Sequence, residues 1–574
     1  MLEQYVGVTI GPIFDAISEA TKPAALWFAS TMFSDLSRRL CFSIQDVFSK
    51  DENMKLKIYS PYLDNADKDR LQDGVGKYHD RIIFSVTESE ENIKKELNQI
   101  IDTEKEETIE IFPDEIVPEL SKDKYKEYLK EYLQINYVIL NQNDIPEEEF
   151  NKGCLLFISP YLDSLELMCQ MPVDNEYNPI LRMFFGDGDN PNSYIMNSKL
   201  VESADKGSNC DSSNMSNCDS SNMVKKNLCE PDLSHSGSYK GIRSIESICG
   251  FTEESKLKHE KYFAVVNADG DFMGQFLKQL NEEKGEVTQF SKCCFNYNKD
   301  VVEKIVKFGG LPIYAGGDDL LFLAPIMHGK ESIFTLCNTI ANEFKNKLSS
   351  DDILKEYTLP SISFGVSIQY YKYPLYEALK SARELLGDYS KNKNWNEPIT
   401  KEEEDKLNDE EKEARKRNMK NCICARLIKH SGQTSEFIVG NEDVDVLNRI
   451  LNTVINYSGK DAENMLRGIG VTLQQFYHLI TQIDVRFAEN NLTIKQLEED
   501  KKPLPWKNIF DNEGQAKSGD FLKEIQDIYY TELINNKKKL EALYITDEYH
   551  TNKQLNALLN ILRFGKFLIE KGER

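Results

Sequence analysis

The sequence has no apolar run that approaches the ~18 residues of a membrane span, and no charged, apolar and small-residue leader opens it. Its 12 cysteines include no CxxC pair, which argues against a disulfide framework. These absences predict a cytoplasmic protein with reduced thiols. Basic charge is also scarce: the net charge of −25 argues against a free-standing nucleic-acid binder held by bulk electrostatics. The length of 574 residues suggests roughly three to five domains.

Carboxylates stand out at the tip of a predicted β-hairpin over residues 311–325. Two apolar runs, bounded by Gly and Pro, flank Gly316, Gly317, Asp318 and Asp319. Glycines at such a turn can take a positive φ and let a phosphate approach the backbone. The aspartates can hold a hard divalent cation that bridges to substrate phosphates. An acidic surface turn is the alternative interpretation of this motif alone.

A second carboxylate cluster lies about fifty residues upstream and favours the metal site. An apolar strand predicted from residue 262 runs into Asp269, Gly270 and Asp271, and a helical pattern follows. If the two strands are neighbours, Asp269 meets Asp318 and Asp319, which is the two-metal arrangement of nucleotidyl-transfer sites. Adjacent strand residues face opposite ways, so which of the hairpin aspartates is the primary ligand stays open.

These motifs carry a family resemblance. The pair DGDxMG at 269–274 and GGDD at 316–319 resembles the large subunit of type III CRISPR effector complexes, the palm-domain protein of the Cmr branch. The strand predicted at 361–368 and the helix at 374–382, leading to 389–391, resemble the next palm elements of that family. Each motif is weak alone, but all four in this order are specific, and fainter likeness extends over most of the chain.

The resemblance implies a metal-dependent nucleotidyltransferase that uses ATP and is switched on by target RNA. Its partners would be other Cmr-type subunits, guide CRISPR RNA and target RNA. The product would be cyclic oligoadenylate or, as in a compact branch, a conjugate of S-adenosylmethionine and AMP. Mg²⁺ or Mn²⁺ would be held by Asp269, Asp318 and Asp319, the catalytic residues, with Gly270. Nucleotide contacts are expected at Asp271, Phe272, Met273, Gly274, Gly316, Gly317, Ser363 and Lys391, where a solvated lysine is the alternative for Lys391.

The predicted fold is α+β, with two ferredoxin-like palm domains. The boundaries are 1–150 for a first, non-catalytic palm, 151–256 for an irregular linker domain, 257–439 for the catalytic palm and 440–574 for a helical domain. The first palm follows a β-α-β-β-α-β order without a GGDD. Asp64 is its candidate substrate contact, with a surface Asx-turn as the alternative. The family often begins with an HD nuclease domain, and the seven histidines, of which His79 is the first, predict that it is absent.

The linker domain contains a polar octamer at 208–215 that repeats at 216–223, which predicts a disordered loop tip. Relatives often hold zinc between the palms with four cysteines. The candidates Cys210, Cys218, Cys229 and Cys249 lack the knuckle spacing of such sites, so zinc is not expected.

Two rival functions remain. A diguanylate cyclase carries Glu after GGD, and Asp319 departs from that signature. A catalytically inert scaffold subunit is the non-enzymatic rival, and the complete set of aspartates argues against it.

Overall fold

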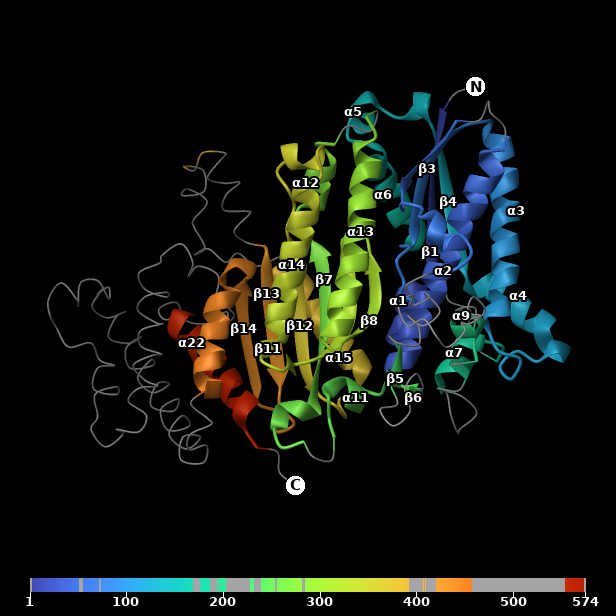
Figure 1. The fold of residues 1–574 in the computed structure, drawn as a ribbon. Helices are drawn as coiled ribbons and strands as arrows, with labels where there is room; N and C mark the ends of the chain where they lie inside the picture. The colour runs from blue at the N-terminus through green and yellow to red at the C-terminus, as the bar shows by residue number, and fades with distance from the viewer. Residues whose placement is uncertain are drawn as a thin grey trace, which may run out of the picture.

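The structure is a computed structural model in which two α/β units lie side by side, each a β-sheet covered by helices (Figure 1). It describes residues 3–50, 55–71, 74–168, 176–185, 194–195, 197–202, 228–231, 239–252, 255–280, 284–391, 406, 408, 420–456 and 553–571. None of the helices in these ranges has the length and apolar character needed to cross a membrane.

The first unit is the predicted first palm. Its sheet has the order β2-β3-β1-β4, all neighbours antiparallel, which is the ferredoxin-like arrangement. Its elements are β1 (Glu3–Gly11), α1 (Ile13–Ser18), α2 (Pro23–Phe48), β2 (Leu56–Ser60), β3 (Arg81–Thr87), α3 (Glu90–Thr108), α4 (Lys122–Tyr132) and β4 (Gln134–Asn141). Pro23 begins α2, where its missing N–H costs nothing.

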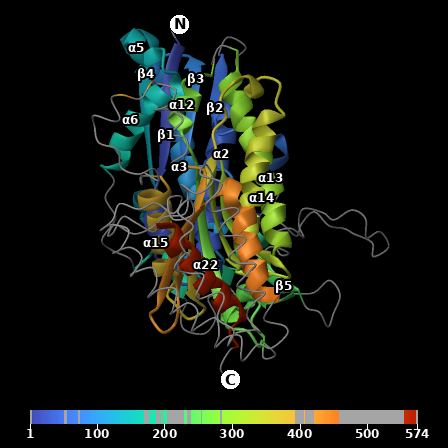
Figure 2. The same ribbon diagram turned by 90° about the vertical axis from the view of Figure 1, so that its left-hand side faces the viewer.

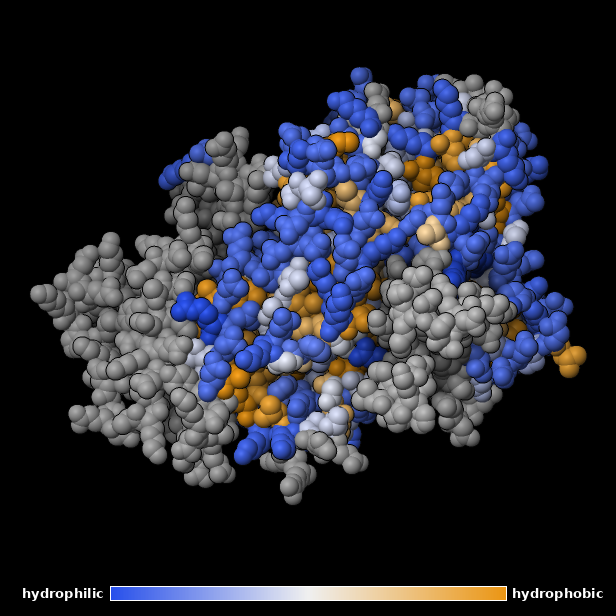
Figure 3. Space-filling model, in the orientation of Figure 1, coloured by the Kyte–Doolittle hydropathy of each residue, from blue (hydrophilic) through white to orange (hydrophobic). Residues whose placement is uncertain are grey.

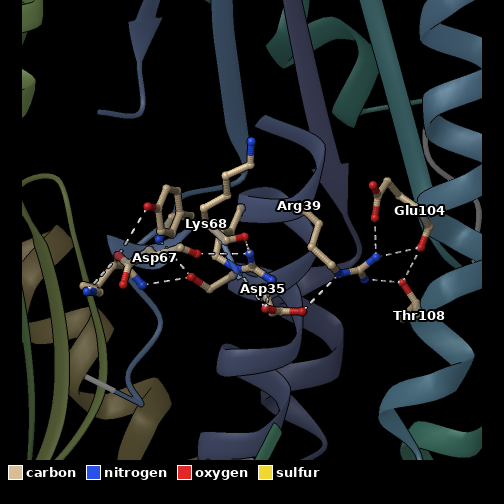
Figure 4. A network of polar contacts seen from close by, with 10 residues as sticks. Asp35, Arg39, Asp67, Lys68, Glu104 and Thr108 are labelled. Carbon is tan, nitrogen blue, oxygen red and sulfur yellow. Dashed lines mark hydrogen bonds and ion pairs between the residues drawn. The ribbon is translucent and has the colours of Figure 1, made fainter. Parts of the chain in front are cut away.

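A buried polar network ties α2 to its surroundings (Figure 4). The Asp35 carboxylate pairs with Arg38 at 2.8 Å and with Arg39 at 3.1 Å. Arg39 in turn reaches Glu104, and it donates to Thr108 Oγ1 at 2.9 Å on α3. Arg38 donates to the carbonyl oxygen of Asp67 at 3.1 Å, in the loop between β2 and β3. The network therefore holds in place the loop between β2 and β3, and this loop contacts the second unit.

The second unit is the predicted catalytic palm. Its sheet has the order β14-β13-β12-β7-β9-β8, with only the β12–β13 pair parallel. The last four strands repeat the ferredoxin-like order, and the β13–β14 hairpin extends it. The elements are β7 (Tyr262–Gly270), α12 (Met273–Leu277), α13 (Glu286–Lys307), β8 (Leu311–Gly316), β9 (Asp319–Pro325), β10 (Met327–His328), β11 (Glu331–Ser332), α14 (Ile333–Ser349), β12 (Ile362–Tyr370), α15 (Leu375–Glu384), β13 (Cys422–Ile428) and β14 (Thr434–Gly440).

Strand β7 is the centre of this unit, and both of its faces are buried. Side chains alternate along a strand, so Val266 packs in the cluster with α13 and α14, while Val265 packs in the cluster with α15 and α2. Figure 2 shows α13 and α14 side by side over one face of the sheet. The outer surface of these helices is largely hydrophilic (Figure 3), as expected for amphipathic helices on a sheet.

The two units meet along β8. Ser30 Oγ of α2 donates to the carbonyl oxygen of Ile313 at 2.9 Å, and the amide of Ala315 donates to the carbonyl oxygen of Gly76 at 2.8 Å. Helix α6 also packs against the first sheet, where the rings of Phe157 and Tyr5 have centroids 5.3 Å apart. The GGDD hairpin is therefore held against the first palm.

The remaining described elements join these two cores. They are α5 (Glu147–Phe150), α6 (Cys154–Glu166), α7 (Pro179–Phe185), α9 (Lys199–Glu202), β5 (Cys229–Pro231), β6 (Tyr239–Ile242), α11 (Ile245–Cys249), a helix at 444–456 and α22 (Lys553–Ile569). Leu447 and Phe564, from the last two helices, share the core of the second palm. The mixed fold with two palms and a helical C-terminal region is thus confirmed. The octamer repeat, Cys210, Cys218 and residues 457–552 of the predicted helical domain lie outside the described residues.

Candidate functional site

The GGDD motif forms the tip of the β8–β9 hairpin, as predicted. Gly316 pairs with Asp319 across the two strands, and Gly317 has φ +64°, a left-handed conformation that favours glycine. The side-chain amide of Asn298, Nδ2, on α13 donates to the carbonyl oxygen of Gly317 at 3.0 Å. Asn298 itself is only 1% exposed, so the turn rests on a side chain that is held firmly in the core.

Asp269 is brought to this tip because β7 and β9 are antiparallel neighbours. Their register runs to the pair Ala268 and Leu320, one residue short of Asp269 and Asp319. Gly270 then lies directly against Asp318: a Cβ built on Gly270 would be 2.5 Å from Asp318 Oδ2. A residue without a side chain is therefore required beside the carboxylate. Asp269, Asp318 and Asp319 therefore lie close together, as predicted.

Their proximity leaves uncompensated negative charge. Burial and the neighbouring Asp269 raise the pKa of Asp318 to about 6. Loss of water around its carboxyl group, together with Asp318 and Asp269, raises the pKa of Asp319 well above its usual value. Asp319 as a whole is exposed at the tip, where its carboxyl group is repelled by the two neighbouring carboxylates. Asp269 and Asp319 are close enough for a hydrogen bond between their carboxyl groups.

Lys391 partly balances this charge from behind. Its ammonium contacts Asp269 Oδ2, donates to the carbonyl oxygen of Asp269 at 2.9 Å, and lies 3.3 Å from Asp271 Oδ1. Burial lowers the pKa of Lys391, but Asp271 and Asp269 outweigh it and raise that pKa above its usual value. In the described part of the chain no three His, Cys, Asp or Glu side chains stand in a ready metal-binding arrangement. The Asp269 carboxylate is turned toward Lys391 instead.

Asp318 and Asp319 line a cavity of about 470 Å³ between the two palms. Gly316 and Gly317 line it too, and helices α12 and α13 add an apolar wall with Met273, Leu277, Val287 and Phe290. The first palm closes the opposite side with Ser60, Lys77, His79, Asp80 and Arg81, and α6 adds Leu155 and Leu156. Asp269 lies beside the two aspartates, outside the cavity wall.

The first-palm wall is a set of residues that sequence reasoning missed. His79 Nε2 lies 2.9 Å from Ser60 Oγ, and burial lowers the pKa of this histidine to about 4, so the ring is neutral. Arg81 is paired with Glu166 at 2.9 Å and with Asp163 at 2.6 Å. No motif marks these positions in the sequence. Their role follows only from the way in which the loop before β3 packs against β8.

Two predicted nucleotide contacts lie away from the cavity. Asp271 and Ser363 are both 0% exposed. Asp271 Oδ2 accepts hydrogen bonds from Ser361 Oγ at 2.7 Å, from Ser363 Oγ at 2.9 Å and from the amide of Asn421 at 2.9 Å. A buried carboxylate needs such partners. The interpretation of Asp271 and Ser363 as nucleotide ligands is therefore corrected: they hold the β7–α12 turn from beneath.

Asp64 is also placed differently from its predicted role. Its side chain accepts a hydrogen bond from the amide of Ala66 at 3.1 Å, as in an Asx-turn, and pairs with Lys299 of α13 at 2.6 Å. It is not among the residues that line the cavity. The alternative of an Asx-turn fits this geometry, and the ion pair adds a contact between the two palms.

The three residues that follow Asp271 do not all face the aspartate cavity. Met273 lines the cavity with the aspartates, whereas Phe272 faces a different cavity and Gly274 is exposed. Of the predicted zinc ligands, Cys249 is a buried free thiol, and burial raises its pKa. The side chain of Cys229 lies outside the described residues, so the expectation about zinc stays a prediction.

Comparison with known proteins shows what this palm is similar to. Residues 262–400 match the family described as Cas10/Cmr2, second palm domain. This match covers the second palm and not the rest of the chain. The CRISPR system Cmr subunit Cmr2 of Pyrococcus furiosus is 31% identical over 158 residues, which cover 23% of this chain and 17% of that relative's length. The predicted resemblance to large subunits of type III CRISPR complexes is thereby confirmed.

Solved structures show the same fold at low identity. The structure described as Type III-B Cmr-beta in the apo state has a TM-score of 0.50 and 11% identity, covering 98% of this chain and 82% of that one. A Csm1-Csm4 cassette in complex with cA4 has a TM-score of 0.46 and 11% identity, covering 91% of this chain and 70% of that one. At such identity the likeness concerns the fold alone.

Proposed function

We propose that this chain is a metal-dependent nucleotidyltransferase that uses ATP, acting as the large subunit of a type III-B CRISPR complex. The observation that carries the proposal is the cavity between the palms. Asp318 and Asp319 line it, Asp269 stands beside them, and both palms contribute its walls. A volume of about 470 Å³ lies in the range of small-molecule sites.

The donor set fits a hard divalent cation. Carboxylate oxygens are the ligands that Mg²⁺ and Mn²⁺ prefer. Burial and repulsion raise the pKa of Asp318 and of Asp319, which means that their ionised forms are unfavourable in the empty site. A bound cation would stabilise these ionised carboxylates. Asp269, Asp318 and Asp319 would hold it, with the carbonyl of Gly270 nearby. Bound there, Mg²⁺ or Mn²⁺ would supply neutralising charge to the phosphates and lower the pKa of the attacking hydroxyl.

The chain's own residues would bind and orient the nucleotide. Met273, Leu277, Val287 and Phe290 offer an apolar wall for the base. Gly317, with no Cβ and open space around it, lets phosphate oxygens approach the hairpin backbone. An acceptor hydroxyl forms the new bond to the α-phosphorus, the bond to the leaving phosphate oxygen breaks, and pyrophosphate departs while the hydroxyl proton passes to water.

The first-palm wall bears on the identity of the acceptor. Its cations are already engaged, Arg81 by Asp163 and Glu166 and Lys77 by Asp67 at 3.0 Å. Asp80 lines the same wall, and burial together with Glu166 raises its pKa. A wall whose cations are already paired offers little attraction to a second triphosphate and suits a cationic acceptor. It favours the S-adenosylmethionine–AMP conjugate over cyclic oligoadenylate as the product.

We further propose that the chain works inside a Cmr-type assembly in the cytoplasm, with guide CRISPR RNA, and that target RNA activates it. The Csm1-Csm4 structures are of paired subunits, and the Cmr-beta structure is of a type III-B protein. The net charge of −25 supports RNA binding through partners rather than through this chain alone.

The test is to incubate the assembled complex with target RNA, Mn²⁺ and labelled ATP, with and without S-adenosylmethionine. We expect a labelled product whose mass identifies it, and its loss in Asp318→Ala/Asp319→Ala, while RNA binding is retained. Unchanged synthesis in that variant would refute the site. No product under any condition would favour the inert scaffold, and a product made only from GTP would favour the diguanylate cyclase.

A further inference from the structure

A second cavity, of about 650 Å³, lies on the other side of α12 from the aspartate cavity. It is lined by α12 and the turn after it, α14, the loop before β12, Asn421 just before β13, and residues 441, 442 and 445 after β14. Two pairs of carboxamides face it, each pair spaced four residues apart: Gln275 with Gln279, and Asn338 with Asn342. Residues at this spacing share one face of a helical turn. Asn342 Nδ2 donates to Asn338 Oδ1 at 3.3 Å.

The floor of this cavity is strained. Among the described residues, only Phe272 (φ 57°) and Asn421 (φ 62°) are non-glycine residues with a positive φ, and both line it. Strained backbone persists where the surrounding structure enforces it, and it clusters at functional sites. Here the buried Asp271 enforces it, since the amide of Asn421 donates to Asp271 Oδ2 at 2.9 Å. Asn441, also in the lining, is 6% exposed, and its Oδ1 is buried without a hydrogen-bond partner.

The charge of the lining limits the class of ligand. Its charged residues are Lys345, Glu442 and Asp445, which sum to a slight negative charge. This balance disfavours a phosphate inside the cavity. Carboxamides, by contrast, pair with the edges of nucleobases, and single-stranded bases are commonly recognised by edge contacts together with aromatic rings. Phe272 supplies such a ring, with Lys420 Nζ 4.3 Å from its centroid.

We propose that this cavity binds a nucleobase, with its sugar and phosphate left outside. The base would come from a single RNA strand or from a free nucleotide, since both present the same edge. The site is separate from the aspartate cavity, so the proposal stands whether or not the chain is a nucleotidyltransferase.

The experiment measures binding to the full chain without divalent cations. The probes are a short oligouridylate, a short oligoadenylate, an abasic strand of the same length, and free AMP. The variants are Asn342→Leu and Gln275→Leu, both exposed in the cavity. Asn346→Leu is the matched control, exposed one turn further along α14 and outside the lining.

We expect a base-bearing probe to bind more tightly than the abasic strand, and each cavity variant to weaken that binding by about fivefold, the lower end for a lost bidentate pair. Asn346→Leu should bind like the wild type. A strand carrying 4-thiouridine should crosslink to peptides of α14. If the cavity variants weaken the binding of free AMP alone, the ligand of the cavity is a free nucleotide. If they weaken the binding of the RNA strands, the ligand is RNA. Equal binding of the abasic strand, no binding, or equal affinities of Asn342→Leu and Asn346→Leu would overturn the proposal.

Discussion

The contact between Gly270 and Asp318 gives the sharpest prediction. A Cβ at position 270 would lie 2.5 Å from Asp318 Oδ2 and 2.7 Å from Met273 Sδ, whereas ordinary contact begins at 3.4 Å. In Gly270→Ala the Asp318 carboxylate must therefore move by about 1 Å. The backbone itself tolerates alanine, because Gly270 is not among the glycines with positive φ. The substitution thus displaces one ligand and leaves the fold in place.

A displacement of this size is costly in a preorganised site, where about 1 Å can reduce the rate 10²-fold. We expect Gly270→Ala to lower the rate of nucleotide synthesis by about that factor and to weaken Mn²⁺ binding, as measured by electron paramagnetic resonance of free Mn²⁺. The melting temperature should change by no more than about 3 °C.

Gly387→Ala is the matched control. A Cβ there meets nothing within 4 Å, and its helical backbone suits alanine. It should keep the wild-type rate and Mn²⁺ affinity. If Gly270→Ala matched it in both measurements, the packing of Asp318 against Gly270 would have no part in the reaction, and the site as described would be wrong.

Four further predictions concern the same site. In Lys391→Met the buried Asp271 loses its cation, so urea unfolding should show a loss of about 3 kcal/mol, against less than about 0.5 kcal/mol for exposed Lys380→Met. Because the pKa of Asp318 is raised to about 6, protons should compete with Mn²⁺ as the pH falls through 6, and titration calorimetry should show affinity falling toward tenfold per pH unit. That raised pKa also means that ionisation of Asp318 opposes folding, so Asp318→Asn should raise the melting temperature without metal at pH ~7.5, with a gain that shrinks toward pH ~4; an unchanged difference would contradict the shift. Asn298→Leu removes the hydrogen bond to Gly317, so we expect kcat to fall about tenfold with KM nearly unchanged, whereas a change in KM alone would contradict a positioning role.

The fold was predictable where hydrophobic periodicity is strong. The predicted strand at 361–368 and helix at 374–382 agree with β12 and α15 to within two residues at each end. The GGDD hairpin followed from two apolar runs around glycines. The sequence offered neighbouring strands for β7 and β9 only as a condition of the metal site. The observed antiparallel pairing meets that condition and brings Asp269 beside Asp319.

The site was predictable only as far as its motifs reach. A sequence motif does not show which side of a turn a carboxylate faces, so the burial of Asp271 could not be predicted and it was expected to contact the nucleotide. The structure separates Asp269 and Asp271 by burial: Asp271 is 0% exposed and its Oδ2 accepts hydrogen bonds from Ser361 and Ser363, while the side chain of Asp269 is 39% exposed. The same hydroxyl groups that looked like base contacts are the reason that Asp271 can be buried.

The first palm shows why function cannot be assigned to the GGDD unit alone. It lacks the acidic motif, yet its loop before β3 supplies Lys77, His79, Asp80 and Arg81 to the cavity wall. That loop is held by Arg38 of α2 and by the Lys77–Asp67 pair, both buried within the first palm. The first palm therefore adds charged residues to a cavity in which the aspartates that would hold the metal belong to the other palm. We expect the choice of acceptor to respond to changes in the first-palm wall.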